Sequence, residues 1–494
     1  MSDNVIHTHN GRLHADTPLS KVDDLVSRAV DRGKLVLHFH GGLVSEQRGR
    51  QIAQFLAPKY EEAGAFPIFF VWEAGLFETI RNNLGEISQE KLFRLILKRV
   101  GKIVARKAAQ TVGDRSAGAL PAVDTTTWDA EMDAALDAMA RGEAASPPPP
   151  PPTQAPMSPL STMEERQLET EMATDFVLRQ EVEAVSNGLR LPDEIAAEMA
   201  SRSATTVKGS SRTLMDPGSL ERLVDRPDPG DRGVISTARI VKAIILVAKR
   251  AIARFLAGRG HGLHATLVEE VLREFYLANV GGLIWKHMKK DTEDTFGDAA
   301  DCGGTAVLQR LNDRMDAGTS LEITLVGHST GAVLIAHLLK KAAEIRPGGF
   351  DFKIVFLAPA VTFDLAHQAI SNHSNEIAGL RIFTMTDENE KKDDLVPVLY
   401  PHSLLYFVSG VVEFEPDAPI LGMARYYEDS DFPDGDFPAV GAMRTYLTQG
   451  DDRVVWSITE GAPAGRNTAA LKHGDFDNED TTIASVQHII ASGL

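Results

Sequence analysis

The pentad GHSTG, residues 327–331, is the stretch whose residue types and spacing point most directly to chemistry. A G-x-S-x-G pattern places a serine hydroxyl on a sharp turn between a strand and a helix, where the hydroxyl can act as a nucleophile. Branched residues 323–326 come before the turn and favour a strand, whereas residues 331–339 have the periodicity of a helix. This context predicts that Ser329 is a nucleophile; the alternative is a glycine-rich turn with an inert serine.

A serine is a weak nucleophile unless a neighbouring base accepts its proton. The candidate base is His473, which lies in the polar loop after the last expected strand, residues 453–459, and before the last expected helix. Small residues around it would let an imidazole reach the edge of the sheet. The alternative is a solvated loop histidine, and His402 and His488 fit the role of base less well.

The base needs a carboxylate that orients it and stabilises its charged form. Three candidates follow the expected strand 380–385: Asp387 lies two residues beyond it, and Asp393 and Asp394 lie further along the same loop. The distance from the strand favours Asp387, whereas the D-x-x-V-P pattern favours Asp393. We therefore take Asp387 as the first candidate and keep the other two open.

An acyl-transfer site also needs hydrogen-bond donors for the oxyanion. The stretch HGGL, residues 40–43, ends an expected strand, and its glycines leave the backbone N–H groups unobstructed. We expect one donor to be the N–H of Thr330, directly after the serine, and the other to be the N–H of Gly42 or Leu43. The alternative is a plain turn that needs glycine for its positive φ.

Apolar runs alternate with amphipathic stretches in two separate blocks of the chain, which predicts a parallel α/β sheet. The first block reads strand, helix, strand over residues 34–43, 46–64 and 66–72. The second begins near residue 305 and reads helix 305–318, strand 321–327, helix 331–345, strand 352–361, strand 380–385, helix 403–413, strand 453–459 and helix 481–492. We expect a discontinuous core, residues 1–77 and 300–494, interrupted by a helical cap or lid, residues 78–299.

Within this insertion, six consecutive prolines stand at residues 147–152. A proline run is extended and solvated, so we expect much of residues 112–236 to be mobile, with one or two short helices such as 162–185. Two other stretches, 91–107 and 237–259, carry seven and six basic residues and no acidic ones. They predict either a lid that lies on an anionic membrane or a cap whose basic faces are solvated or meet the acidic linker.

The composition excludes several function classes. A net charge of −18 argues against general nucleic-acid binding, which needs a basic surface. The chain has one cysteine, begins with a polar stretch and has no uncharged run near the ~20 residues of a membrane span, so we expect a soluble cytoplasmic protein. We expect no cofactor and no metal, because no phosphate-binding loop or metal-ligand cluster is evident, and His38 and His40 alone are a weak pair.

Taken together, these motifs resemble the α/β-hydrolase superfamily. The resemblance rests on HGGL after a strand, GHSTG between strand and helix, an aspartate after the next-but-one strand and KHGDF after the last. The order Ser, Asp, His is the one that this fold uses. It implies a mostly parallel sheet flanked by helices, and ester hydrolysis through an acyl-serine. Leu43 stands where some subfamilies have a third glycine, and the insertion is longer than usual.

The resemblance leaves three functions open. The first is a lipase- or phospholipase-like enzyme whose insertion forms a lid and which acts on a lipid or another acyl ester. The second is a soluble carboxylesterase or thioesterase with the same three residues. The third is a protein without catalysis that uses the insertion to bind a partner or a membrane, because the fold alone does not determine a reaction.

Overall fold

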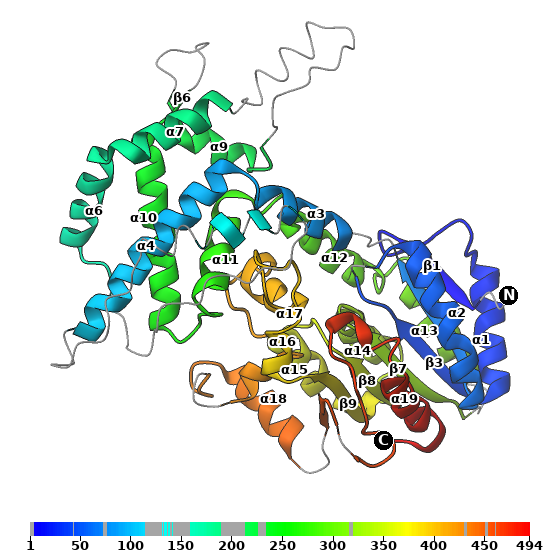
Figure 1. Ribbon diagram of the computed structural model, residues 1–494. Helices are drawn as coiled ribbons and strands as arrows, with labels where there is room; N and C mark the ends of the chain where they lie inside the picture. The colour runs from blue at the N-terminus through cyan, green and yellow to red at the C-terminus, as the bar shows by residue number, and fades with distance from the viewer. Residues whose placement is uncertain are drawn as a thin grey trace, which may run out of the picture.

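The protein is described by a computed structural model (Figure 1). The structure describes residues 4–42, 44–72, 77–113, 131, 133–135, 137, 138, 141, 159–188, 213–225, 234–315, 320–428, 432–449, 453–459 and 461–494. The proline run at 147–152, most of the stretch expected to be mobile and Leu43 lie outside these residues, so the predictions made for them stay predictions.

A mixed eight-stranded sheet forms the centre of the protein, which confirms the α/β class. Its strand order is β10-β9-β8-β7-β3-β4-β1-β2, and every pair of neighbours is parallel except β1 and β2. The strands are β1 (Val5–His9), β2 (Arg12–Leu13), β3 (Lys34–Phe39), β4 (Phe66–Trp72), β7 (Glu322–His328), β8 (Phe352–Leu357), β9 (Ile377–Met385) and β10 (Val454–Ser457).

Helices cover both faces of this sheet because successive strand residues point to opposite sides. Leu35, Leu37 and Phe39 of β3 join one apolar cluster, and Val36 of the same strand joins another. The first cluster is covered by α1 (Leu19–Arg32), α13 (Gly303–Met315), α14 (Gly331–Ile345), α15 (Phe363–Asn372) and α18 (Pro438–Thr448). The second is covered by α2 (Glu46–Glu62) and α19 (Asp480–Ser492).

The central strands β3 and β7 lie side by side, and this pairing brings two distant motifs together. The register places Phe39 opposite Gly327. Both strands run in the same direction, so the glycine turn after β3 and the serine turn after β7 leave the sheet at the same edge. The short helices α16 (Asp387–Glu390) and α17 (Leu404–Phe407), a π-helical turn (Val408–Val412) and a 3-10 turn (His473–Asp475) complete this block.

The insertion is mainly helical. Figure 1 shows α4, α6, α7, α9 and α10 on the side away from the sheet, with α3, α11 and α12 nearer to it. Its elements are α3 (Phe77–Ile87), α4 (Lys91–Gly113), α6 (Thr162–Thr174), α7 (Phe176–Gly188), α9 (Pro217–Leu223), β5 (Val224–Asp225), β6 (Val234–Ile235), α10 (Thr237–Leu256), α11 (Leu263–Phe275) and α12 (Gly282–Asp294). Among the described residues, no helix combines the length and the apolar character needed to cross a membrane.

The helix expected over residues 162–185 is two helices. Asp175 separates α6 from α7 with extended dihedrals, φ −69° and ψ 109°. Its carboxylate accepts a hydrogen bond from the N–H of Leu178 at 3.0 Å. Aspartate at the start of a helix satisfies an N–H group that has no partner inside the helix, so this side chain ends one helix by starting the next.

The two basic stretches form α4 and α10, which pack against each other. Their apolar faces are buried, and their cations pair with acidic residues of the insertion. Arg99 lies 2.7 Å from Asp175 and 2.9 Å from Glu181, and the ammonium group of Lys107 lies 2.5 Å from Glu164. These contacts favour internal charge pairing over a basic surface that faces a membrane.

A buried ionic network joins the insertion to the core. His261 lies between two carboxylates, with Nδ1 2.7 Å from Glu269 and Nε2 2.7 Å from Asp417, and all three side chains are inaccessible to solvent. Arg254 adds a contact of 2.7 Å to Glu269, and Arg259 adds one of 3.2 Å to Asp417. Buried charges must be paired, so these residues fix the α10–α11 hairpin to the core.

We expect Asp417→Asn to lower the free energy of unfolding by about 3–5 kcal/mol, because buried His261 and half-buried Arg259 both lose the carboxylate that they contact. Chemical denaturation measures this loss. The matched control is Asp301→Asn, which breaks an exposed pair with Arg12 and should lower stability far less, because water screens these charges. Equal losses in the two variants would show that the network does not hold the insertion in place.

Candidate active site

Ser329 lies on a strained turn between β7 and α14. Its φ is 54°, in the left-handed region that residues with a side chain rarely adopt. The end of β8 holds the turn: the N–H of Ser329 donates to the carbonyl of Leu357 at 2.9 Å, and its own carbonyl accepts from Ala360 at 3.0 Å. The predicted strand, turn and helix are therefore confirmed, and strain of this kind is often found at functional sites.

The glycines on either side of the serine are needed because backbone segments approach each other closely. A Cβ atom on Gly327 would lie 2.9 Å from the backbone of Gly331. A Cβ atom on Gly331 would overlap the carbonyl group of Phe39, at the end of β3. The pentad thus packs helix α14 directly onto the two central strands.

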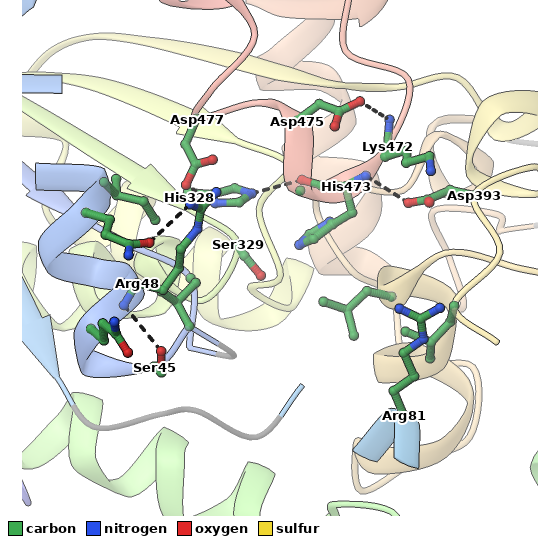
Figure 2. A pocket seen from close by; sticks show the side chains of 18 of the residues that line it. Ser45, Arg48, Arg81, His328, Ser329, Asp393, Lys472, His473, Asp475 and Asp477 are labelled. Carbon is green, nitrogen blue, oxygen red and sulfur yellow. Dashed lines mark hydrogen bonds and ion pairs between the residues drawn. The ribbon is translucent and has the colours of Figure 1, made fainter. Parts of the chain in front are cut away.

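Ser329 lines a cavity of about 720 Å³ at this edge of the sheet (Figure 2). Residues from distant parts of the chain meet there, among them His473, Asp393 and Asp394. The side chains of Arg48, Arg81 and Lys472 also line it, so the cavity carries charges of both signs beside apolar walls such as Leu395 and Leu404. The structure brings together the predicted nucleophile, the predicted base and two of the three candidate acids.

The imidazole of His473 extends into the cavity on the side of Ser329 (Figure 2). The residue is 6% exposed, and neither ring nitrogen has a hydrogen-bond partner. Burial, aided by the charge of nearby His328, lowers the pKa of His473 to about 3. The ring is therefore neutral near pH 7, with one nitrogen available to accept a proton.

The structure places the three candidate acids in two locations: Asp393 and Asp394 line the cavity, and Asp387 does not. The carboxylate of Asp393 accepts a hydrogen bond from the backbone N–H of His473 at 2.8 Å, and burial raises the pKa of both Asp393 and Asp394. Asp387 is not among the residues that line the cavity. Its carboxylate accepts from the hydroxyl of Tyr406 at 2.6 Å and pairs with Lys391 at 2.6 Å; burial raises its pKa, but these contacts outweigh burial and lower it.

The expected oxyanion donors differ in their surroundings. Thr330 begins α14, where the first N–H groups of a helix have no partner inside the helix. The N–H of Gly42 donates to the hydroxyl oxygen of Thr330 and so does not point freely into the cavity. A Cβ atom on Gly42 would overlap the sulfur of Met288 in α12, so the insertion touches this turn. Leu43 lies outside the described residues.

His328 and Asp477 belong to the site, although sequence reasoning did not select them. The Nδ1 atom of His328 lies 3.1 Å from Asp477 Oδ2, and its Nε2 atom lies 3.0 Å from the carbonyl oxygen of His473. The rings of His328 and His473 stack with 5.3 Å between their centres. No local pattern indicates these roles, because His328 is the variable position of the pentad and Asp477 is one of several acids in its loop.

A second cluster, His7, His14 and Asp16, has donor atoms close enough to hold a metal ion, which sequence analysis did not foresee. The Nδ1 atoms of His7 and His14 lie 3.2 and 3.0 Å from one oxygen of Asp16. Arg50, however, lies 2.7 Å from the same carboxylate and 3.4 Å from His7 Nδ1. A guanidinium already neutralises the acid, so the cluster is satisfied as an ion pair.

The fold and the site are those of an α/β protein with a strained serine turn at the carboxyl edge of a parallel sheet. Comparisons of the chain with protein-family models, curated proteins and solved structures find no match. The chemistry of the site therefore rests on its own residues and geometry.

We expect Gly331→Ala to lower the free energy of unfolding by about 1–3 kcal/mol, because the added methyl group forces α14 away from β3. Urea denaturation measures this loss. Gly435→Ala is the control, since a Cβ atom there meets nothing within 4 Å. A Gly331→Ala protein as stable as the Gly435→Ala protein would contradict the close packing of the turn.

Proposed function

We propose that this protein is a serine ester hydrolase with the α/β-hydrolase fold. Ser329 is the nucleophile, His473 the base and Asp393 the acid. The observation that carries the proposal is the strained Ser329 turn, which shares one cavity with a buried histidine whose ring nitrogens have no partner. A nucleophile and a base in one cavity are two of the parts that acyl transfer to serine requires, and the carboxylate of Asp393 lies on the backbone N–H of the same histidine.

The proposed reaction has two halves. The Ser329 hydroxyl oxygen attacks the carbonyl carbon of the ester while His473 accepts the hydroxyl proton. The tetrahedral intermediate then collapses, the bond to the leaving oxygen breaks, and His473 returns the proton to the departing alcohol. Water attacks the acyl-serine in the same manner, with His473 as base, and releases the carboxylic acid and the free serine.

Asp393 is the acid that the geometry supports best, in place of Asp387. A histidine with a pKa near 3 is a weak base, and a carboxylate on its ring would strengthen it. Asp393 binds the backbone N–H of His473, so of the three candidates its carboxylate is the one in direct contact with the proposed base. Asp387 is engaged by Lys391 and Tyr406.

The oxyanion would take its first donor from the N–H of Thr330. The N–H of Gly42 becomes a second donor if its hydrogen bond to the Thr330 hydroxyl breaks, which the arrival of a carbonyl oxygen could cause. The N–H of Leu43 remains the other candidate. Met288 lies over Gly42, so substrate entry and formation of this donor pair both involve α12.

For the substrate, the site supports an ester with an apolar acyl part and a polar leaving group. Leu404 lines the cavity of Ser329 and also a small neighbouring cavity whose lining is apolar. The second cavity lies between α3, α12 and α17, with Ile80, Trp285, Met288 and Phe407 among its walls. Its volume is only about 10 Å³, so these walls would have to move apart before an acyl chain could enter; their apolar character alone favours a lipase- or phospholipase-like enzyme. The polar residues around Ser329 favour the alternative, a soluble carboxylesterase or thioesterase.

We expect a fluorophosphonate probe to label the protein covalently, because such a probe reacts with an activated serine. Ser329→Ala and His473→Ala, each checked for folding, should abolish labelling. Mass spectrometry of the labelled peptide locates the adduct. A parent protein that stays unlabelled would contradict the enzyme proposal and favour the binding protein; a panel of short soluble esters and long-chain lipid esters then separates the esterase from the lipase.

We expect Asp393→Asn to lower kcat by about 10³–10⁴-fold, because the base then loses the charge that stabilises its protonated form. Asp387→Asn should cost far less, since its carboxylate serves Lys391 and Tyr406. Rates of ester hydrolysis, or of probe labelling, measure both. The reverse order of effects would restore Asp387 as the acid.

A further inference from the structure

We propose that His328 is a positioning residue that carries a proton on both ring nitrogens and in that form holds the turn bearing His473 against the end of β7. The proposal deepens the proposed function and rests on it wherever activity is the readout. The protonation state of His328 does not depend on catalysis, so it can be measured separately from activity.

Both ring nitrogens of His328 face groups that accept hydrogen bonds. Nδ1 lies 3.1 Å from a carboxylate oxygen of Asp477, and Nε2 lies 3.0 Å from the carbonyl oxygen of His473. A backbone carbonyl has no proton to donate, and a neutral imidazole has only one N–H. Only the imidazolium form gives both contacts a donor, provided that Asp477 is ionised.

The surroundings support this charge state. Burial alone would lower the pKa of His328, but the charge and the hydrogen bond of Asp477 outweigh burial and raise it. Burial alone would raise the pKa of Asp477, but the charge and the hydrogen bond of His328, with smaller contributions from His38 and Arg48, outweigh burial and lower it. The neighbouring histidines are uncharged near pH 7, since burial lowers the pKa to about 3 for His38, about 4 for His40 and about 3 for His473. A single buried ion pair, His328 with Asp477, thus lies beside the nucleophile.

The ion pair holds His473 from one side while Asp393 holds it from the other. Asp393 binds the N–H of His473, and His328 binds its C=O. With both backbone groups engaged, the imidazole has a defined starting position beside Ser329 (Figure 2). If His328 loses one proton, at most one of its two hydrogen bonds can remain, and the turn at residues 473–477 is held less firmly.

The raised pKa of His328 sets the direction in which stability changes with pH. The pKa of His328 is raised in the folded protein, so its contribution to stability is present below the ordinary histidine value of about 6.5 and is lost as pH rises through the folded pKa. In the proposed enzyme, kcat should therefore fall on the alkaline side as the turn is released. Asp477→Asn removes the charge that opposes burial, so it should move this loss to lower pH.

The first test is ¹⁵N NMR of protein labelled at histidine, recorded as pH is raised from 6 upward. We expect one buried histidine with both ring nitrogens protonated at neutral pH, a signal assigned by its loss in His328→Gln. In Asp477→Asn the deprotonation should occur at least about one pH unit lower. His488→Gln, which removes an exposed histidine of α19, should leave this signal unchanged. A neutral His328 at pH 7, or a titration that Asp477→Asn does not move, overturns the proposal.

The second test is the pH profile of kcat for ester hydrolysis. His328→Gln should lower kcat by about 10²-fold with little change in KM, because His473 is displaced, and should remove the alkaline limb. Asp477→Asn should shift that limb to lower pH. An unchanged alkaline limb in both folded variants overturns the positioning role. A parent that neither hydrolyses esters nor reacts with the probe, yet shows the protonated His328 by NMR, defeats the proposed function and leaves the ion pair standing.

Discussion

The contact between helix α14 and strand β3 is the constraint on which the site depends. Gly331 meets the carbonyl of Phe39 so closely that an added Cβ atom would overlap it, and this contact lets α14 start only two residues after the end of β7. Only Ser329 and Thr330 connect the strand to the helix, and in this tight turn Ser329 adopts a φ of 54°. The strain is maintained because two adjacent parallel strands and a buried helix hold the turn from all sides.

The insertion is part of the same structure and contributes to the site. A buried network of His261, Glu269 and Asp417 fixes its α10–α11 hairpin to the core. Helix α12 of the insertion contacts the turn after β3, where Met288 packs against Gly42. Cations of the two basic helices α4 and α10 form ion pairs with acidic residues of the insertion, and the two helices pack against each other.

Electrostatics at the site follow from burial. Water is excluded from several histidines near Ser329, and burial keeps most of them neutral. His328 differs because the carboxylate of Asp477 accompanies it. A neutral His473 and a charged His328 can therefore stack on each other, while the backbone of His473 is held between His328 and Asp393.

The sequence by itself determined the elements whose pattern is local. The strand at 66–72, the helix at 331–345 and the turn that holds Ser329 agree with the structure, because apolar periodicity and glycine spacing act over a few neighbouring residues. Strands β1 and β2 and helix α1 carried no pattern strong enough to be recognised. Only the tertiary structure decided that Asp393, not Asp387, meets His473, and that His328 pairs with Asp477. These pairs join residues 80 and 149 positions apart, and packing of the sheet, not local sequence, brings them together.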